Sequence, residues 1–348
     1  MTTGRGTIHN TAAATETHPP PGPTSTPPPR HLIGLAGLER DRLAGLLHAA
    51  HAVDPEPAAP IDTAPMRPGA PIALLFFEDS TRTRVSFALA ARRIGAQPVE
   101  LTTSGSSISK GETLTDTARA IEAMGVRAIV VRAGQSGAAA QIASRVRLPV
   151  VNAGDGRHEH PTQALIDALC FARAHDRTDT FDLSGLSLAI VGDLARSRVF
   201  RSDVAAFTAL GAEVIGVGPP GMAPASLATL GVRIERDLDA LLPEVDGVQM
   251  LRVQRERGGA GALASVREYR DGYALTARRA ERMKPHAVVM HPGPINRGVE
   301  IDHEPAEGGP GLPHSLILDQ VAAGVPVRAA VLLDLLAPRT PAPEAATP

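Results

Sequence analysis

The stretch "IALLFFEDSTRTRVSFALAARR" (72–93) joins two different patterns, and this junction decides the fold. Its first part, "IALLFF" (72–77), is a continuous apolar run, typical of a strand buried in a parallel sheet. Its second part has apolar residues at helical spacing. We expect these to face a core: Val85, Ala88, Leu89 and Ala91. A strand that leads directly into a helix indicates a βαβ unit, and hence an α/β protein.

Polar residues fill the junction between strand and helix, in the order "STRTR" (80–84). A helix start offers free backbone N–H groups and a positive dipole end, so this position suits a phosphate group. Arg82 could hold phosphate oxygens with a bidentate fork, whereas Arg84, two residues on, would point elsewhere. The alternative is a capped helix with solvated arginines, and this stretch alone does not decide between the two.

Further apolar runs follow, each ending at a polar or glycine-bearing stop before a helical segment. They are "AIVV" (128–131), "PVVNAG" (149–154), "LAIVGD" (188–193), "EVIGVG" (213–218), "GVQML" (247–251) and "AVVMH" (287–291). Together they predict an α/β fold with two doubly wound domains, each with a parallel sheet flanked by helices. We expect the break between the sheets near 176–185, and a first helix near 37–52.

Length, composition and charge narrow the class of protein. The 348 residues exceed most single domains, and 43% hydrophobic with 21% charged residues is ordinary for a globular protein. A net charge of −2 argues against general binding to nucleic acid or membranes. The single cysteine, Cys170, fits a reducing cytoplasm. Both ends, 1–30 and 338–348, are rich in proline and are expected to be disordered tails.

Polar and basic residues recur where the predicted strands end. In open α/β sheets, ligands bind outside the carboxyl ends of the strands, so these residues are candidates for a site. They are Ser80 to Arg82, Arg132, the segments 152–160 and 193–198, Arg252 with Gln254, and "HPGP" at 291–294. This concentration exceeds what scattered surface charge would give, and it predicts a site for anions.

Two glycine-bearing loops add candidates. The first, "SGSSISKGETLTDT" (104–117), carries one lysine, Lys110, which could close over an anion; a flexible surface loop is the simpler interpretation. The second, "NAGDGRHEH" (152–160), leads into a helix that should begin at the proline of "HPTQ". His160 and Gln163 would converge there, where a histidine can stabilise an oxyanion and a glutamine can bind an amide.

The "HEH" triplet (158–160) lacks the spacing of the usual zinc-binding helix motif and has no cysteine support, which argues against a metal site. His158 and Glu159 are therefore interpreted as solvated loop residues.

Together, these motifs resemble those of the aspartate and ornithine carbamoyltransferase family. "FFEDSTRTR-SF", "SKGETLTDT", "NAGDG---HPTQALID" and "HPGP-NRGVEI" stand in the family's order and spacing, and the resemblance runs from about residue 31 to residue 337. It implies a transferase in which L-aspartate attacks carbamoyl phosphate, giving N-carbamoyl-L-aspartate and phosphate in pyrimidine synthesis. No metal or organic cofactor is implied.

The resemblance also implies a role for each candidate residue. The phosphate and its bridging region would be bound by Ser80, Thr81, Arg82 and Thr83. The carbonyl oxygen would contact Arg132 and His160, which with Thr83 form the implied catalytic set. The carbamoyl amide would be held by Gln163 and the Pro292-Gly293-Pro294 turn. The two carboxylates of aspartate would be bound by Arg198 and by Arg252 with Gln254.

The resemblance further implies a homotrimer with shared active sites, in which Ser106 would reach carbamoyl phosphate and Lys110 aspartate from a neighbouring chain. The first domain, 31–170, would bind carbamoyl phosphate, and the second, 171–315, would bind aspartate. A final helix, 316–337, would pack back on the first domain. A dihydroorotase or a regulatory chain is left open as a further partner, and neither nucleic acid nor a membrane is expected.

Two positions depart from the family pattern, which usually has Glu at Ala88 and His at Ala133. Arg84 would then lose its helical partner four residues on. One rival interpretation is a carbamoyltransferase for ornithine or another amine. "HPGP" lacks that enzyme's cysteine, and "RVQ" (252–254) supplies an arginine for a second carboxylate, so aspartate is favoured. The other rival is a non-catalytic, anion-binding paralogue that keeps the fold.

Overall fold

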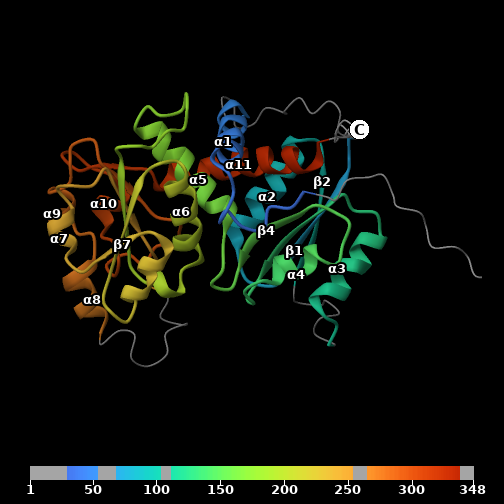
Figure 1. Cartoon of the computed structure of the whole chain (residues 1–348), viewed down its shortest axis with the longest axis horizontal. Helices are drawn as coiled ribbons and strands as arrows, with labels where there is room; N and C mark the ends of the chain where they lie inside the picture. The colour runs from blue at the N-terminus through green and yellow to red at the C-terminus, as the bar shows by residue number, and fades with distance from the viewer. Residues whose placement is uncertain (1–29, 54–67, 103–110, 254–264, 338–348) are drawn as a thin grey trace, which may run out of the picture. The chain divides into compact units, whose positions relative to one another are not determined.

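Two parallel sheets with helices packed against them organise the chain (Figure 1). The computed structural model describes residues 30–53, 68–102, 111–253 and 265–337, which all belong to one compact unit.

The first sheet has the strand order β2-β1-β3-β4, and all of its neighbouring strands are parallel. Its strands are β1 (Pro71–Phe76), β2 (Gln97–Thr102), β3 (Ala128–Ala133) and β4 (Val150–Asp155). The helices that connect them are α2 (Thr81–Arg93), α3 (Leu114–Ala123) and α4 (Ala138–Ala143). Most residues of β1, β3 and β4 are buried, which explains why these strands are continuous apolar runs.

The second sheet has the order β10-β9-β8-β5-β6-β7, again with parallel neighbours. Its strands are β5 (Ser187–Val191), β6 (Glu213–Val217), β7 (Arg233–Glu235), β8 (Gly247–Met250), β9 (Val288–Met290) and β10 (His314–Ser315). Its helices are η2 (Leu194–Arg196), α6 (Arg198–Ala209), η3 (Ala225–Leu230), α7 (Leu238–Leu241), α8 (Val266–Tyr273), α9 (Ala277–Ala280) and α10 (His303–Glu307). From β5, the first strand of this sheet in the chain, the strands β6 and β7 are added on one side and β8, β9 and β10 on the other.

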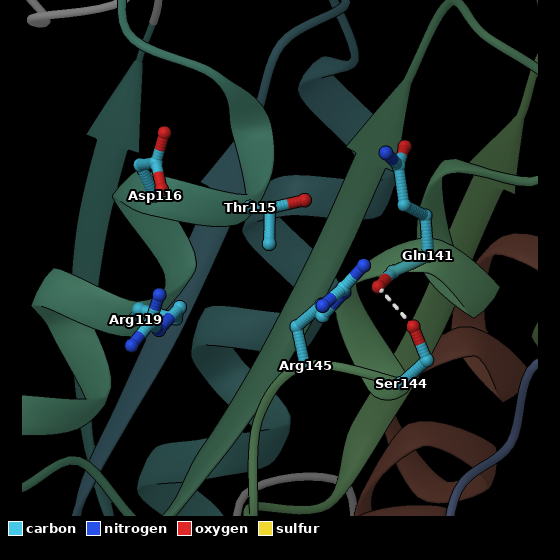
Figure 2. Close-up of a pocket in the computed structure, with 6 residues that line it drawn as sticks. All are labelled: Thr115, Asp116, Arg119, Gln141, Ser144 and Arg145. Carbon is cyan, nitrogen blue, oxygen red and sulfur yellow. Dashed lines mark hydrogen bonds between the residues drawn. The ribbon is translucent and has the colours of Figure 1, made fainter.

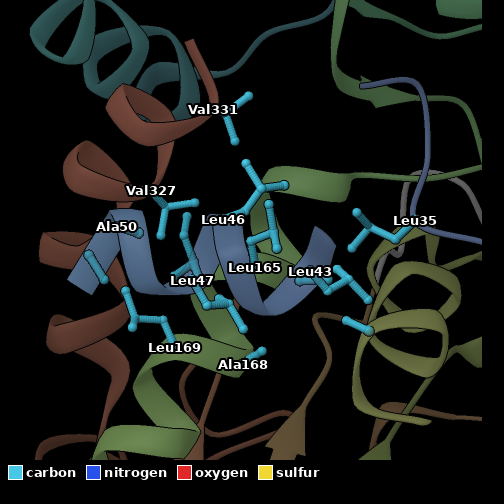
Figure 3. Close-up of a cluster of buried hydrophobic side chains, with 14 of the residues drawn as sticks. Leu35, Leu43, Leu46, Leu47, Ala50, Leu165, Ala168, Leu169, Val327 and Val331 are labelled. Atoms are coloured by element: carbon cyan, nitrogen blue, oxygen red, sulfur yellow. The ribbon is translucent and has the colours of Figure 1, made fainter. Parts of the chain in front are cut away.

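Three helices join the two sheets through one apolar core: α1 (Arg40–Val53), α5 (Pro161–Ala174) and α11 (Ile317–Leu336). The C-terminal helix α11 packs against α1, α2 and α5, and α5 also packs against α6 of the second sheet. Figure 3 shows side chains that meet among these helices: Leu43, Leu47, Leu165, Leu169 and Val327. The last helix of the chain therefore contributes to the part of the molecule that holds the first sheet.

The sequence predictions for the strands and the first helix are confirmed. Every predicted apolar run forms a strand, the helix near 37–52 is α1, and the chain passes between the sheets in the segment after α5. Three strands were not predicted: β2, β7 and β10. Strand β2 lies at a sheet edge and includes Val99, which is 37% exposed, so its "QPVELT" sequence has no continuous apolar run.

One prediction about the core is wrong. Ala88 and Ala91 are buried as expected, but Val85 and Leu89 are 49% and 44% exposed. They lie on the side of α2 that borders a large cavity. Helical spacing identifies which side chains share a face, but not what covers that face.

Candidate active site

One cavity of about 1130 Å³ gathers residues from segments that adjoin both sheets. It lies at the carboxyl ends of the strands: α2 begins after β1, Arg132 stands near the end of β3, and the turn at 292–294 follows β9. The helices α5, α6 and α11 add side chains to the wall. Loops at the carboxyl ends of parallel strands are where an α/β fold can change its side chains without disturbing its core.

Most of the residues predicted from the sequence line this cavity. They are Ser80, Thr81, Arg82, Thr83, Arg132, His160, Gln163, Arg198, Arg252, Pro292, Gly293 and Pro294. The remaining three, Ser106, Lys110 and Gln254, lie outside the described residues. The cavity therefore brings together candidates from segments that are far apart in the sequence.

The start of α2 presents hydrogen-bond donors to the cavity. Ser80 is the N-cap residue with extended backbone, and its side chain makes no capping hydrogen bond, so the hydroxyl does not occupy the first-turn N–H groups. Arg82 follows in the first turn, and its pKa is lowered by partial burial and then by the positive charge of Arg252. Two guanidinium groups held near each other favour the binding of an anion between them.

A turn after β9 closes around Arg82. Gly293 has a φ of +68°, and a Cβ there would lie 3.1 Å from guanidinium atoms of Arg82, so glycine permits the close approach. The backbone N–H of Gly293 donates to Nδ1 of His291 at 2.8 Å, while Nε2 of His291 lies 3.3 Å from Glu300. Burial lowers the pKa of His291, so a neutral ring with its proton on Nε2 satisfies both contacts and fixes the turn.

Two further arginines share one carboxylate. Oε2 of Glu78 lies 2.9 Å from Nη1 of Arg198 and 3.6 Å from Nε of Arg132, and all three side chains are largely buried. Gly154, with a φ of +112°, leaves room for both arginines. A Cβ at this position would lie 2.9 Å from Nε of Arg198 and 3.3 Å from Nη1 of Arg132. Glu78, which lies between β1 and α2, thus holds one arginine from β3 and one from α6 by ion pairs.

His160 is the N-cap residue of α5, and its imidazole is buried in the cavity wall. Its pKa is lowered well below the ordinary value, first by burial and then by the positive charges of Arg132, Arg198 and Arg328. Its backbone N–H donates to Oγ of Ser202 at 2.8 Å, which fixes the start of the helix. A neutral imidazole beside arginines can donate one N–H to a developing oxyanion without adding a further charge.

The prediction from sequence missed three cavity residues that matter electrostatically or sterically: Glu78, Gln320 and Arg328. Arg328 is buried in α11, and burial lowers its pKa to about 9. Its guanidinium donates to Oγ of Ser86 and lies over the ring of Phe87. The signal was available, since Arg328 is the single charged side chain in the apolar segment "VPVRAAVLL".

One interpretation of a loop residue needs correction. Glu159 is not solvated: its buried carboxylate accepts from the backbone N–H groups of Leu35 and Ala36 and from Oγ of Ser202. It ties the N-terminal segment to α6, because backbone donors so enclosed require an acceptor. Arg84, whose helical neighbour four residues on is Ala88, pairs instead with Glu100 of the edge strand β2 at 3.6 Å.

A second hollow, of about 510 Å³, lies between α3 and α4 (Figure 2). It is lined by Thr115, Asp116, Arg119, Gln141, Ser144 and Arg145, and none of the predicted site residues is among them. Within the described ranges, no group of three or more His, Cys, Asp or Glu side chains could hold a metal ion. The same part of the chain contains no helix long and apolar enough to cross a membrane.

Two parallel sheets with a cavity rich in arginine at their carboxyl ends define an α/β protein that binds small anions. Family models sharpen this class. The model described as "Aspartate/ornithine carbamoyltransferase, carbamoyl-P binding domain" matches residues 30–173, and the one described as "Aspartate/ornithine carbamoyltransferase, Asp/Orn binding domain" matches residues 184–335. The chain belongs to the aspartate/ornithine carbamoyltransferase family.

Curated relatives lie on the aspartate side of that family. The aspartate carbamoyltransferase catalytic subunit of Myxococcus xanthus is 50% identical over 303 residues, which cover 87% of this chain and 98% of the relative. The catalytic subunit from a Nocardioides species is 46% identical over 315 residues, covering 90% and 96%.

Solved structures agree in fold. Aspartate transcarbamoylase of Trypanosoma cruzi in complex with N-(phosphonacetyl)-L-aspartic acid aligns with a TM-score of 0.78 and 29% identity, covering 90% of this chain and 98% of that one. Ornithine carbamoyltransferase from Thermus thermophilus aligns with a TM-score of 0.75 and 26% identity, covering 88% and 99%. The fold is thus common to both activities, whereas the high sequence identity is to the aspartate enzymes.

Proposed function

We propose that this chain transfers the carbamoyl group of carbamoyl phosphate to the amino group of L-aspartate, giving N-carbamoyl-L-aspartate and phosphate. The observation that carries the proposal is the convergence of Arg82, Arg132, Arg198 and Arg252 on one cavity. A near-dianionic phosphate and a dicarboxylate can share a pocket only where several fixed cations offset their repulsion. The names of the curated relatives support the same reaction.

The phosphate end of the donor would bind at the start of α2, with Ser80, Thr81 and Thr83 as hydroxyl donors and Arg82 as the charged clamp. Arg132 and His160 would polarise the carbonyl oxygen. Because His160 is neutral, the positive charge at that oxygen comes from Arg132 and the imidazole adds a directed N–H. Polarisation of this kind is worth about 3–4 kcal/mol per donor.

The acceptor end would bind on the other side of the cavity, with Arg198 on the α-carboxylate of aspartate and Arg252, helped by Gln254, on the side-chain carboxylate. Bringing the amine against the carbonyl in a fixed orientation can lower the barrier by about 7–11 kcal/mol. The leaving phosphate would accept the amine proton. Ornithine carries no second carboxylate for Arg252 and Gln254 to bind, so that substrate is disfavoured.

The proposed division of labour assigns carbamoyl phosphate to residues 31–170, with the helix at 316–337 packed on that part, and aspartate to residues 171–315. The contacts of α11 with α1 and α2 support this grouping. We place the enzyme in the cytoplasm and in pyrimidine synthesis. A dihydroorotase or regulatory chain remains an open partner.

A homotrimer with shared sites is part of the proposal, with Ser106 and Lys110 supplied by a neighbouring chain. Exposed apolar residues at the rim of the cavity support it: Val85 and Leu89 on α2, and Val321 on α11, which is 49% exposed. Exposed apolar side chains grouped beside a polar site are typical of surfaces that another chain covers.

The function is tested with purified protein, by following carbamoyl-aspartate formation and phosphate release from carbamoyl phosphate and L-aspartate. Turnover with ornithine in place of aspartate would overturn the acceptor assignment, and no turnover with any amine would favour a non-catalytic paralogue. The shared site is tested by mixing inactive Lys110→Ala and His160→Ala chains under conditions that allow subunit exchange. Recovery of activity is expected; its absence would contradict a site built from two chains.

A further inference from the structure

A buried network of amides and carboxyl groups lies behind the cavity wall. Its members come from four elements: Asp167 and Gln163 on α5, Asp203 on α6, Gln249 on β8 and Gln320 on α11. Gln163 and Gln320 line the cavity, whereas Asp167, Asp203 and Gln249 are fully buried. Two acidic side chains without contact with solvent need a specific arrangement of donors, so the network invites a role beyond packing.

The hydrogen bonds of the network converge on Asp167. Its Oδ1 accepts from Nε2 of Gln163 at 2.8 Å and from Nε2 of Gln320 at 2.7 Å, and its Oδ2 accepts from Nε2 of Gln249 at 2.7 Å. Asp203 accepts fewer hydrogen bonds. Its Oδ2 accepts from the same Gln249 nitrogen at 2.9 Å, but its buried Oδ1 accepts no hydrogen bond from the described residues.

This asymmetry places the negative charge on Asp167 and a proton on Asp203. A carboxylate needs several donors, which Asp167 has, while a neutral carboxyl group needs few and can itself donate to a neighbour. Burial, followed by the nearby charge of Asp167, raises the pKa of Asp203 well above its ordinary value. Burial also raises the pKa of Asp167, but the amide donors of Gln320, Gln249 and Gln163 oppose that rise. Both carboxyl groups accept from Nε2 of Gln249, so the proton of Asp203 lies beside Asp167. The positive charge of Arg328, on α11, interacts with the carboxyl group of Asp167 and favours its ionised form.

The direction of each amide then follows. Gln320 accepts the backbone N–H of His291 on Oε1 at 2.9 Å, so only its Nε2 can face Asp167. An ionised Asp167 is purely an acceptor, so Gln163 must also turn its NH₂ group toward it. The other branch of the Gln163 amide, Oε1, receives no hydrogen bond from the described residues and belongs to a side chain that lines the cavity.

We propose that Asp167 is a positioning residue, which fixes the Gln163 side chain so that its carbonyl oxygen faces the substrate. The inference rests on the proposed function. An outward-facing Oε1 accepts a hydrogen bond from the amino group of a carbamoyl donor. A donor that carries a methyl group in the same place leaves this acceptor without a hydrogen bond, so the orientation of Gln163 set by Asp167 favours carbamoyl over acyl groups.

A matched pair of variants tests the assignment: Asp167→Asn and Asp203→Asn make the same change at neighbouring sites. In Asp203→Asn the new amide can donate to Asp167 as the carboxyl proton did, so kcat and the KM for carbamoyl phosphate should stay within about twofold of wild type. In Asp167→Asn, one of the two side-chain oxygens of residue 167 is replaced by an NH₂ group. That group then faces an NH₂ group of a neighbouring glutamine, so one hydrogen bond of the network is lost. The KM for carbamoyl phosphate should rise, and the preference for carbamoyl phosphate over acetyl phosphate should fall roughly tenfold.

Phosphate release measures both donors, since aspartate and acetyl phosphate would give N-acetyl-aspartate and phosphate, with hydrolysis subtracted. An equal loss with both donors in Asp167→Asn would indicate a merely structural role and overturn the proposal. So would an Asp203→Asn variant as impaired as Asp167→Asn. If wild type shows no turnover with carbamoyl phosphate and aspartate, the proposed function fails, while the proton assignment is still decided by unfolding.

Urea unfolding between about pH 5 and pH 8 provides that second readout. A carboxyl group whose folded-state pKa is raised keeps its proton while the unfolded chain loses it, so rising pH destabilises the fold by up to about tenfold in the unfolding constant per pH unit. Asp203→Asn removes this contribution, and its stability should decline less with pH than that of wild type. Equal pH dependence in the two proteins would contradict a proton on Asp203.

Discussion

The two sides of the cavity differ in how the protein treats its arginines. On the α2 side, Arg82 packs against Gly293 and pairs with no carboxylate among the described residues. On the α6 side, Arg198 packs against Gly154 and is held by Glu78, which also approaches Arg132. The first side is ready for a multiply charged anion, whereas on the second a substrate carboxylate must replace one supplied by the protein.

This difference suggests how one pocket can bind two anions without confusing them. An arginine already paired to a carboxylate attracts a second anion weakly, because much of its charge is neutralised at short range. An unpaired arginine at a helix start attracts phosphate strongly. The contrast predicts that inorganic phosphate binds on the Arg82 side in the absence of other ligands.

The largest effect is expected when Arg82 is removed. Arg82→Ala should lower kcat/KM for carbamoyl phosphate roughly a thousandfold, because a charged, bidentate contact to the transferred phosphate is lost. Steady-state kinetics and the inhibition constant of inorganic phosphate measure this loss. A phosphate inhibition constant close to that of wild type would place the phosphate elsewhere.

Removing the carboxylate of Glu78 should have a smaller effect than removing Arg82, and through Arg198 it should act on aspartate binding. Glu78→Gln releases Arg132 and Arg198 from a shared carboxylate, so both lose their fixed orientation. We expect kcat/KM for aspartate to fall roughly tenfold, as for the loss of a buried charged pair. Inorganic phosphate should bind at least as tightly as before, since a negative charge leaves the cavity; weaker phosphate binding would argue against the contrast between the two sides.

Alanine substitutions at Gly293 and Gly154 test the two sides of the cavity separately, because each glycine packs against the arginine of one side. Gly293→Ala crowds the Arg82 guanidinium, and Gly154→Ala crowds Arg198, each at a positive φ that L-residues adopt at a strain of about 1–3 kcal/mol. We expect Gly293→Ala to raise mainly the KM for carbamoyl phosphate and Gly154→Ala mainly that for aspartate. Circular dichroism and thermal unfolding separate this effect from loss of the fold, and identical KM changes in both variants would contradict two distinct sides.

The neutral imidazole of His160 predicts a dependence of stability on pH. Its folded-state pKa lies well below 6.5, so the unfolded chain takes up a proton near 6.5 that the folded chain does not. Stability should therefore fall as pH drops through 6.5, by up to about 1.4 kcal/mol per pH unit from this residue. Urea unfolding of wild type and His160→Gln isolates its contribution, because His31, His175 and His291 act in the same direction in both proteins.

The smallest effect is expected at Arg84, which follows Arg82 by two residues and does not line the cavity. Arg84 lies 3.6 Å from Glu100, and both side chains are partly exposed. Ion pairs of this kind stabilise a fold by about 0–1 kcal/mol. Arg84→Ala should keep kcat/KM within about twofold of wild type. This variant is the matched control for Arg82→Ala, and a large loss of activity would show that the two arginines act together.

Much of the fold could be predicted because its strands are buried on both faces. "IALLFF" and "LAIVGD" are apolar throughout, so they are recognised without knowledge of their neighbours. Strand β2 was not predicted, because its exposure at the sheet edge interrupts the apolar pattern. Val85 and Leu89 were wrongly predicted to be buried, because their face of the helix borders a cavity. Local patterns report burial, and burial at an edge or a rim depends on distant segments.

By itself the sequence determined the chemistry of the site, since arginines and hydroxyls placed after apolar strands must gather at the carboxyl ends of parallel sheets. It also indicated the family, whose motifs stand in order along the chain. Only the tertiary structure decided which groups act on one another: Glu78 between Arg132 and Arg198, Glu159 against the N-terminal segment, and Asp167 beside Asp203. Electrostatic coupling and hydrogen-bond direction depend on separations of a few ångströms between residues that are distant in the chain, and folding alone sets those separations.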